Sequence, residues 1–220
     1  VSHELNQPLA AMKTYLAGAK LLLERKRAEE AIVSFRRIDD LIERMGAITR
    51  QLKSYARKAG DSLAPVDMRD AVTSALAIME PQLKARKIRI TKTLPQSPAI
   101  VLGDRLRLEQ VIINLLRNAF DATNASDTAA VDILLTSGEQ VLLAVRDNGQ
   151  GIENLDDLFE PFYTTKQPGD GVGLGLAISS GIVTDLGGRL TARNAANGGA
   201  VFEVVLPIYR AEGEKDDAAE

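Results

Sequence analysis

Apolar residues in the first sixty positions recur at alternating steps of three and four. The members of this pattern are Leu5, Leu9, Met12, Leu16, Ala19 and Leu23, followed by Ile38, Leu41, Met45, Ile48, Leu52 and Tyr55. Such spacing places one apolar seam along a helix, as in coiled coils and helical bundles. The charged run ERKR at 24–27 separates the two segments. We therefore predict two long antiparallel helices with a short connection.

A single helical hairpin exposes much of its apolar seam to water. A second copy of the same hairpin would cover that seam, and this predicts a dimeric four-helix bundle. The alternative is a hairpin that packs inside one monomeric domain.

Beyond the hairpin, the pattern changes to shorter segments of both periods. Residues 58–65 (KAGDSLAP) interrupt the helical spacing, which is typical of a linker. Helices are predicted at 67–86, 104–123 and 173–186, and strands at 88–94, 100–102, 131–136, 140–147, 189–194 and 200–206. Several strands in one layer with three helices predict an α/β sandwich.

Charge follows the same division of the chain. Residues 1–60 carry 12 Lys and Arg against 7 Asp and Glu, and the remainder carries 15 against 23. This asymmetry favours two modules, and the formal net charge of −3 indicates no nucleic-acid partner. We predict a helical domain at 1–59, a linker at 60–66, an α/β domain at 67–209 and a disordered, charged tail at 210–220.

Two further features concern the context of the chain. The absence of cysteine excludes disulfides and thiolate metal sites, and no apolar run approaches the length of a membrane span. The chain begins on Val1 inside a predicted helix, so we interpret it as part of a longer protein.

The segment DNGQG at 147–151 carries the first candidate chemistry. Asp147 continues the apolar face of the strand that includes 141–145. A carboxylate at the end of a buried row needs a donor, such as the exocyclic amine of a base, and Gly149 and Gly151 would let a ligand approach the backbone. The alternative is a turn with a solvated carboxylate.

Two more segments contain residues that could bind a nucleotide. Gly171, Gly173 and Gly175 precede a predicted helix at alternate positions, and such a loop can gather N–H groups around phosphates; the alternative is a flexible loop. Asn114 and Asn118 lie one turn apart on another predicted helix. One amide oxygen with nucleotide phosphates would suit Mg²⁺, whereas the alternative is a solvated polar face.

Together, these motifs resemble the transmitter region of bacterial sensor histidine kinases. VSHELNQPL at 1–9 resembles the H-box, NLLRNA at 114–119 the N-box, DNGQG at 147–151 the G1-box, LFEPF at 158–162 the F-box and GVGLGL at 171–176 the G2-box. The resemblance extends from residue 1 to about 207. HELNQPL and the FYTTK at 162–166 are most similar to the nitrogen-regulation and dicarboxylate-transport sensor branch.

The resemblance implies an architecture and an activity. It implies a dimerisation and phosphotransfer domain followed by an ATP-binding domain of the histidine kinase, gyrase and Hsp90 type. The implied cofactors are ATP and Mg²⁺, and the implied partners are a second copy of the chain and a response-regulator receiver domain. The missing N-terminal part would be a membrane-anchored sensor, with this region on the cytoplasmic side of an inner membrane.

The resemblance also implies roles for single residues. His3 would accept the γ-phosphoryl group of ATP, and Glu4 would orient its ring and accept its proton. Asp147 would bind the adenine amine, and Asn118 would be the Mg²⁺ ligand. The other implied nucleotide contacts are Asn114, Gly149, Gly151, Thr164, Thr165, Lys166, Gly171, Gly173, Gly175 and Leu176.

Some positions depart from the family pattern or bear on rival functions. Gln7 stands where many relatives have Thr or Asn, linked to phosphatase activity, and Val172 stands where the G2-box often has Thr. One rival is an ATP-hydrolysing switch of the same fold, and Asn114, in place of a water-activating glutamate, argues against it together with His3. The other rival is a non-catalytic dimerisation module, which the intact Asp147, Asn118 and glycine row disfavour.

Overall fold

The chain forms two compact units, one purely helical and one of mixed helices and strands. The computed structural model describes residues 2–56, 63–124, 128–161, 163–164 and 173–210. Residues 60–62 of the predicted linker and residues 211–220 of the predicted tail lie outside this description. No helix within the described ranges combines the length and hydrophobicity needed to cross a membrane.

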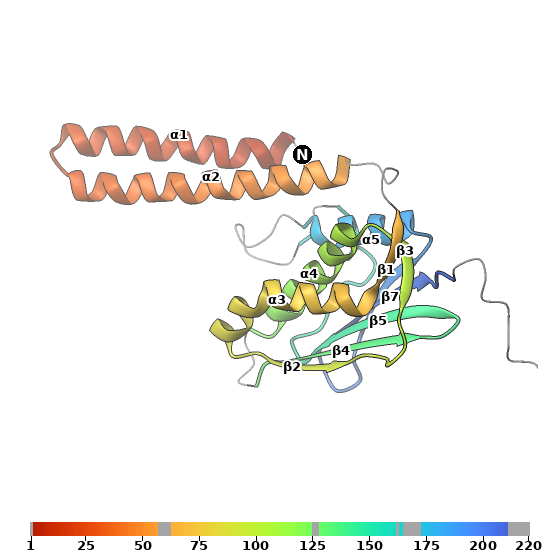
Figure 1. Ribbon diagram of the computed structural model, residues 1–220. Coiled ribbons are helices and arrows are strands. Elements are labelled where there is room, and N and C mark those ends of the chain that lie inside the picture. Colours follow the sequence, from red (N-terminus) through yellow and green to blue (C-terminus); the bar gives the residue numbers. More distant parts are fainter. Residues whose placement is uncertain (1, 57–62, 125–127, 162, 165–172, 211–220) are drawn as a thin grey trace, which may run out of the picture. The chain divides into compact units, whose positions relative to one another are not determined.

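The helical unit is the predicted antiparallel hairpin of α1 (Ser2–Glu24) and α2 (Ala28–Ala56) (Figure 1). α1 ends at Glu24, and the chain turns at Lys26, which adopts a left-handed φ of 63°. The N–H groups of Lys26 and Arg27 then donate to the carbonyls of Leu23 and Leu22, which satisfies the last turn of the helix. The charged run at 24–27 therefore caps the end of α1 and forms the turn between the two helices.

The two helices bury small residues where they pack, and leave large ones exposed. Ala19 and Ala31 are fully buried. The exposed large apolar side chains of the hairpin are Leu9, Tyr15, Leu16, Leu21, Leu23, Ile32, Val33, Phe35 and Ile42. The hairpin by itself therefore has no closed core among its described side chains.

The second unit is an α/β sandwich. Its elements are β1 (Ala64–Asp67), α3 (Met68–Arg86), β2 (Arg89–Thr93), β3 (Ile100–Gly103), α4 (Arg105–Ala122), β4 (Ala130–Ser137), β5 (Gln140–Asp147), α5 (Gly175–Asp185), β6 (Arg189–Asn194) and β7 (Ala200–Pro207). Five strands form one sheet in the order β2-β4-β5-β7-β6, and β1 pairs with β3 in a separate ribbon. Only the β2–β4 pair is parallel among these described strands.

The alternation of residues along the strands determines which face of the large sheet is covered. Along β4, Val131, Ile133 and Leu135 are buried, while Asp132 and Leu134 are exposed. Figure 1 shows α3 and α4 on the same side of this sheet. The largest fully buried side chains of this unit are Phe120, Met68, Met79, Leu108, Ile112, Leu115, Leu116, Ile133, Leu135, Leu143 and Leu206. One apolar layer between helices and sheet is therefore the core.

The predicted linker is corrected at its end. Residues 64–66 form most of β1, which pairs antiparallel with β3 so that Val66 lies opposite Val101. Pro65 is compatible with this short ribbon because an edge strand need not donate every N–H. The first strand therefore belongs to the α/β unit. Likewise, α5 begins at Gly175, two residues later than predicted.

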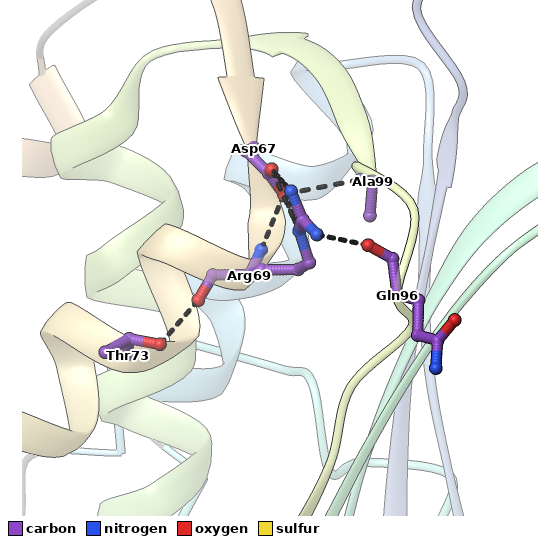
Figure 2. A network of polar contacts seen from close by, with 5 residues as sticks. All are labelled: Asp67, Arg69, Thr73, Gln96 and Ala99. Carbon is purple, nitrogen blue, oxygen red and sulfur yellow. Dashed lines mark hydrogen bonds and ion pairs between the residues drawn. The ribbon is translucent and has the colours of Figure 1, made fainter.

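A polar network anchors the start of α3, where Asp67 is the N-cap (Figure 2). The Asp67 carboxylate accepts hydrogen bonds from the N–H of Arg69 at 3.0 Å and of Ala99 at 3.3 Å. The Arg69 guanidinium donates to the same carboxylate and to the carbonyl of Gln96 at 2.7 Å. Burial opposes ionisation of Asp67, but the hydrogen bonds from Arg69 and Ala99 prevail and lower its pKa.

Candidate nucleotide site

The Asp147 carboxylate is buried at the end of β5, with one oxygen satisfied and one not. Its side chain is 2% exposed. Oδ1 accepts hydrogen bonds from the N–H of Gly149 at 2.9 Å and of Ala200 at 3.2 Å. Oδ2 is buried, and no described residue donates a hydrogen bond to it. This excludes the solvated turn and leaves one buried acceptor without a donor among the described residues.

The local sequence explains this burial. Val141, Leu143 and Val145 face the core of the unit, and the two-residue period of the strand places Asp147 in the same row. Burial raises the pKa of Asp147, although the N–H groups of Gly149 and Ala200 favour the ionised form. A donor that reached Oδ2 would remove part of the cost of burying the charge.

The glycines after Asp147 are required by close packing. A Cβ at Gly149 would lie 2.4 Å from the carbonyl oxygen of Ala122 at the end of α4. Gly151 has a φ of 80°, which is a conformation that favours glycine. Gly149 therefore packs against the end of α4, the helix that carries Asn114 and Asn118, and the approach of a ligand to this loop stays a prediction.

The Asn114 side chain links α4 to the first turn of α5. Its Nδ2 donates to the carbonyl oxygen of Gly175 and to Oγ of Ser179, both at 3.2 Å. The Ser179 hydroxyl is fully buried and donates to the same carbonyl at 2.9 Å. Asn114 is therefore not on a solvated face, and it brings the asparagine pair next to the helix that follows the glycine row.

The structure describes some of the other predicted site residues of this unit and leaves the rest outside its described ranges. Asn118 lies half-buried one turn beyond Asn114 on α4, and Leu176 lies half-buried in the first turn of α5. Gly173 has a φ of 69° just before that helix, and Thr164 is exposed. Thr165, Lys166 and Gly171, which we also predicted to contact nucleotide, lie outside the described residues, as does Val172.

The predicted phosphoacceptor lies on the other unit. His3, Glu4 and Gln7 fall in the first two turns of α1, and their side chains lie outside the description. His3 and Gln7 are four residues apart, so they occupy one face of the helix.

The turn between β6 and β7 contains residues of the site that the sequence did not reveal. Asn194 exchanges hydrogen bonds with the backbone of Ile152. A Cβ at Gly199 would lie 2.0 Å from the carbonyl oxygen of Asp147. The sequence predicted a connection between the strands at 189–194 and 200–206, but nothing in it indicated which loop this connection would contact. Ser179 was missed for the same reason.

Comparisons with known families agree with this geometry. Residues 1–60 match the His Kinase A (phospho-acceptor) domain, and residues 103–210 match the histidine kinase-, DNA gyrase B-, and HSP90-like ATPase. The chain belongs to the sensor histidine kinases. The predicted pairing of a phosphoacceptor region with an ATP-binding domain is therefore confirmed for this histidine kinase core.

Curated relatives narrow the branch. The C4-dicarboxylate transport sensor protein DctB of Pseudomonas aeruginosa is 39% identical over 210 residues, which cover 94% of this chain and 34% of that protein. DctB of Rhizobium meliloti is 39% identical, with coverage of 90% and 32%. These similarities confirm the predicted likeness to dicarboxylate-transport sensors. The chain spans about a third of the length of both relatives.

Solved structures confirm the fold class. The catalytic domain of histidine kinase ThkA is 28% identical with a TM-score of 0.60, covering 67% of this chain and 99% of that one. The Acinetobacter baumannii histidine kinase AdeS has a TM-score of 0.74 at 24% identity, covering 94% of this chain and 98% of that one. Both the helical and the α/β parts of the predicted fold are represented.

Proposed function

We propose that this core transfers the γ-phosphoryl group of ATP to His3, and from there to an aspartate of a response-regulator receiver domain. The observation that carries the proposal is the buried Asp147 carboxylate, whose Oδ2 has no donor among the described residues. The exocyclic amine of adenine is a donor of the required kind. Guanine presents a carbonyl oxygen at that ring position, which would repel Oδ2.

The opposite end of the site suits phosphate. The first N–H groups of a helix are unpaired and lie at the positive end of its dipole. The first turn of α5 begins at Gly175 and is tied to α4 through Asn114, so phosphate at this helix end would lie near Asn118. Gly173, Gly175 and Leu176 would line this end, with Gly171, Thr164, Thr165 and Lys166 bordering it.

A Mg²⁺ ion fits the donor chemistry of this site when nucleotide is present. The described residues contain no cluster of three or more acidic or histidine side chains that could hold a metal. Mg²⁺ commonly takes few protein ligands and completes its shell with phosphate oxygens and water. We propose that the Asn118 amide oxygen supplies the protein ligand. The ion would neutralise phosphate charge, which is most of what catalysis of phosphoryl transfer requires.

The transfer itself would take place at the ring of His3. One ring nitrogen would attack the γ-phosphorus, the bond to the bridging oxygen would break, and ADP would leave. Glu4 would accept the hydrogen bond from the other ring N–H and stabilise the charge that forms on the ring. Since an amide such as Asn114 cannot act as a base toward water, the site favours histidine over water as acceptor.

We further propose the assembly and context of the protein. The exposed apolar side chains of α1 and α2 support a homodimer that forms a four-helix bundle. The similarity to C4-dicarboxylate transport sensor proteins supports an N-terminal sensor region anchored in a membrane, with this core in the cytoplasm. We propose a phosphotransfer domain at 1–59, a linker ending before β1, and an ATP-binding domain from residue 64 to about 209.

The test is a labelling experiment with γ-labelled ATP and Mg²⁺. Wild type should acquire label that survives base and is lost in acid, as a phosphoramidate does. His3→Ala should acquire none while retaining ATP binding, and Asp147→Ala should lose both binding and label. Label that persists in His3→Ala would contradict transfer to histidine. If neither protein is labelled and both release labelled phosphate at the same rate, the result would favour an ATP-hydrolysing switch.

A further inference from the structure

The side chain of Asn194 holds both backbone polar groups of Ile152. The N–H of Ile152 donates to Oδ1 of Asn194 at 2.7 Å, and Nδ2 of Asn194 donates to the carbonyl oxygen of Ile152 at 2.9 Å. Asn194 is the last residue of β6, whereas Ile152 follows the loop that begins at Asp147. One side-chain amide thus acts here as a strand neighbour would.

Two further contacts join the same pair of segments. A Cβ at Gly151 would lie 2.9 Å from Oδ1 of Asn194, so the loop approaches that amide as closely as glycine allows. At the other end of the turn, Gly199 lies against the carbonyl oxygen of Asp147, and the Ala200 N–H donates to Oδ1 of Asp147. The β6–β7 turn therefore contacts the loop at both of its ends.

This arrangement has a consequence for the carboxylate. Oδ1 of Asp147 receives one hydrogen bond from Ala200, on the turn, and one from Gly149, on the loop. The orientation of Oδ2 therefore depends on where the loop holds the N–H of Gly149. Asn194 fixes the loop three residues further on, at Ile152, and so limits how far Gly149 can move. Without that restraint the loop could release Oδ1 and let the carboxylate rotate.

We propose that Asn194 is a positioning residue for recognition of the nucleotide base. It contacts no nucleotide itself; it acts through Ile152 and the glycine loop to hold Oδ2 of Asp147 toward the exocyclic amine. This inference rests on the proposed ATP-binding function. Its specific content is that Asn194 sets discrimination between bases, beyond any contribution to the stability of the β6–β7 turn.

The experiment compares Asn194→Ala with Asn197→Ala in the full chain. Asn197 is an exposed asparagine of the same turn, so both variants lose the same chemical group. Dissociation constants are measured for ATP and for inosine triphosphate, which has a carbonyl oxygen where adenine has its exocyclic amine and therefore lacks the donor at that ring position. Thermal denaturation checks that each variant is folded.

For Asn194→Ala we expect ATP binding to weaken by about 5- to 20-fold, as for the loss of one or two hydrogen bonds. Binding of inosine triphosphate should not weaken by more than about twofold, because its carbonyl oxygen gains no hydrogen bond from Oδ2 in the wild-type orientation. The ratio of the dissociation constant for inosine triphosphate to that for ATP should therefore fall by at least about 2.5-fold. Asn197→Ala should leave both constants within about twofold of wild type.

A purely structural role gives a different result. Weakening of both nucleotides by the same factor in Asn194→Ala, with an unchanged ratio, would overturn the inference and leave the proposed function intact. Failure of wild type to bind ATP would overturn both.

If Asn194→Ala does not fold, Asn194→Asp carries the test. It keeps the acceptor for the Ile152 N–H but places a carboxylate oxygen against the Ile152 carbonyl. A reduced ratio in that variant supports the inference, and a wild-type ratio contradicts it.

Discussion

The two units of this chain solve the problem of burying apolar surface in opposite ways. The α/β unit covers its large apolar side chains with its own elements, and its largest core residues are fully buried. The hairpin buries Ala19 and Ala31 but exposes large side chains such as Leu16 and Ile42. Two helices provide one contact line, whereas a sheet with helices on one face encloses a layer. The α/β unit encloses its core by itself, whereas the hairpin leaves large apolar side chains exposed.

The same difference separates the kinds of chemistry the units support. A closed core can hold a charged group such as Asp147 away from water and direct one of its oxygens at a ligand. An open hairpin offers its residues along an exposed surface, where other molecules can reach them. The proposed roles of adenine recognition and phosphoryl acceptance follow this division.

The largest effect should come from truncating the core of the α/β unit. Phe120 on α4 is fully buried, and Phe120→Ala should lower the free energy of unfolding by about 3–5 kcal/mol through lost burial and a cavity. Leu16→Ala, at a side chain that is 57% exposed, should change unfolding of the α/β unit by less than about 0.5 kcal/mol. Calorimetry on both variants checks this contrast, and similar effects of the two would refute it.

The second effect concerns association of the hairpin. Leu16→Glu places a charge in the surface that we propose is covered by the second copy, and should weaken dimerisation by about 30-fold or more. Analytical ultracentrifugation measures the change. Ala17→Glu adds the same charge at the neighbouring exposed position and should have little effect. A monomeric wild type, or equal effects of both variants, would contradict the four-helix bundle. ATP affinity should be unchanged in both.

A smaller effect is expected where the α/β unit begins. Asp67→Ala removes the N-cap of α3 and should cost about 1–2 kcal/mol at neutral pH. Because the pKa of Asp67 is lowered in the folded state from 3.8, its contribution is present above that pH and is lost as pH falls through the lowered value.

Denaturant unfolding at pH 7 and pH 3 should therefore show a smaller difference between wild type and Asp67→Ala at the lower pH. Asp70→Ala, an exposed acid in the same first turn, serves as the control and should change stability by less than about 0.5 kcal/mol. A difference that grows on acidification would contradict the hydrogen-bonded carboxylate.

The smallest effect on stability should accompany a large loss of binding. Asp147→Asn removes a buried charge and should raise the free energy of unfolding by about 1 kcal/mol at pH 7, while abolishing ATP binding. Burial raises the folded-state pKa of Asp147 above 3.8, so wild type loses stability as pH rises through this window.

The gain from Asp147→Asn should therefore shrink toward zero as pH is lowered to about 4. Parallel denaturation of wild type and variant between pH 4 and pH 8 measures the difference directly. A lower free energy of unfolding for Asp147→Asn at pH 7 would show that the buried carboxylate does not destabilise the fold. It would then remove the argument that Oδ2 is left unpaired for a ligand.

Most elements could be predicted because their signals are local. The steps of three and four that predict the hairpin, and the N-caps of α3 and α4 at Asp67 and Asp104, involve neighbouring residues only. β1 was missed because a four-residue strand containing Pro65 has little periodicity, and its pairing partner β3 lies more than thirty residues away. Pairing of strands so far apart in the sequence is decided only by the tertiary structure.

The candidate site divides in the same way. The row of 141–145 offered burial of Asp147 as one of two alternatives, beside a solvated turn, since a strand's period is local. No such pattern connects Asn194 to Ile152, Asn114 to Ser179, or Gly199 to Asp147, since each pair comes from segments that meet only in the folded sheet and helices.

By itself, the sequence determined two helices with an apolar seam, an α/β unit, and the residue types that can bind adenine, phosphate and Mg²⁺. These follow from periodicity and side-chain chemistry, which each residue carries wherever it lies. The tertiary structure alone decided that Oδ1 of Asp147 is satisfied and Oδ2 is not. Such directions depend on backbone atoms from distant segments, and only packing brings those atoms to one place.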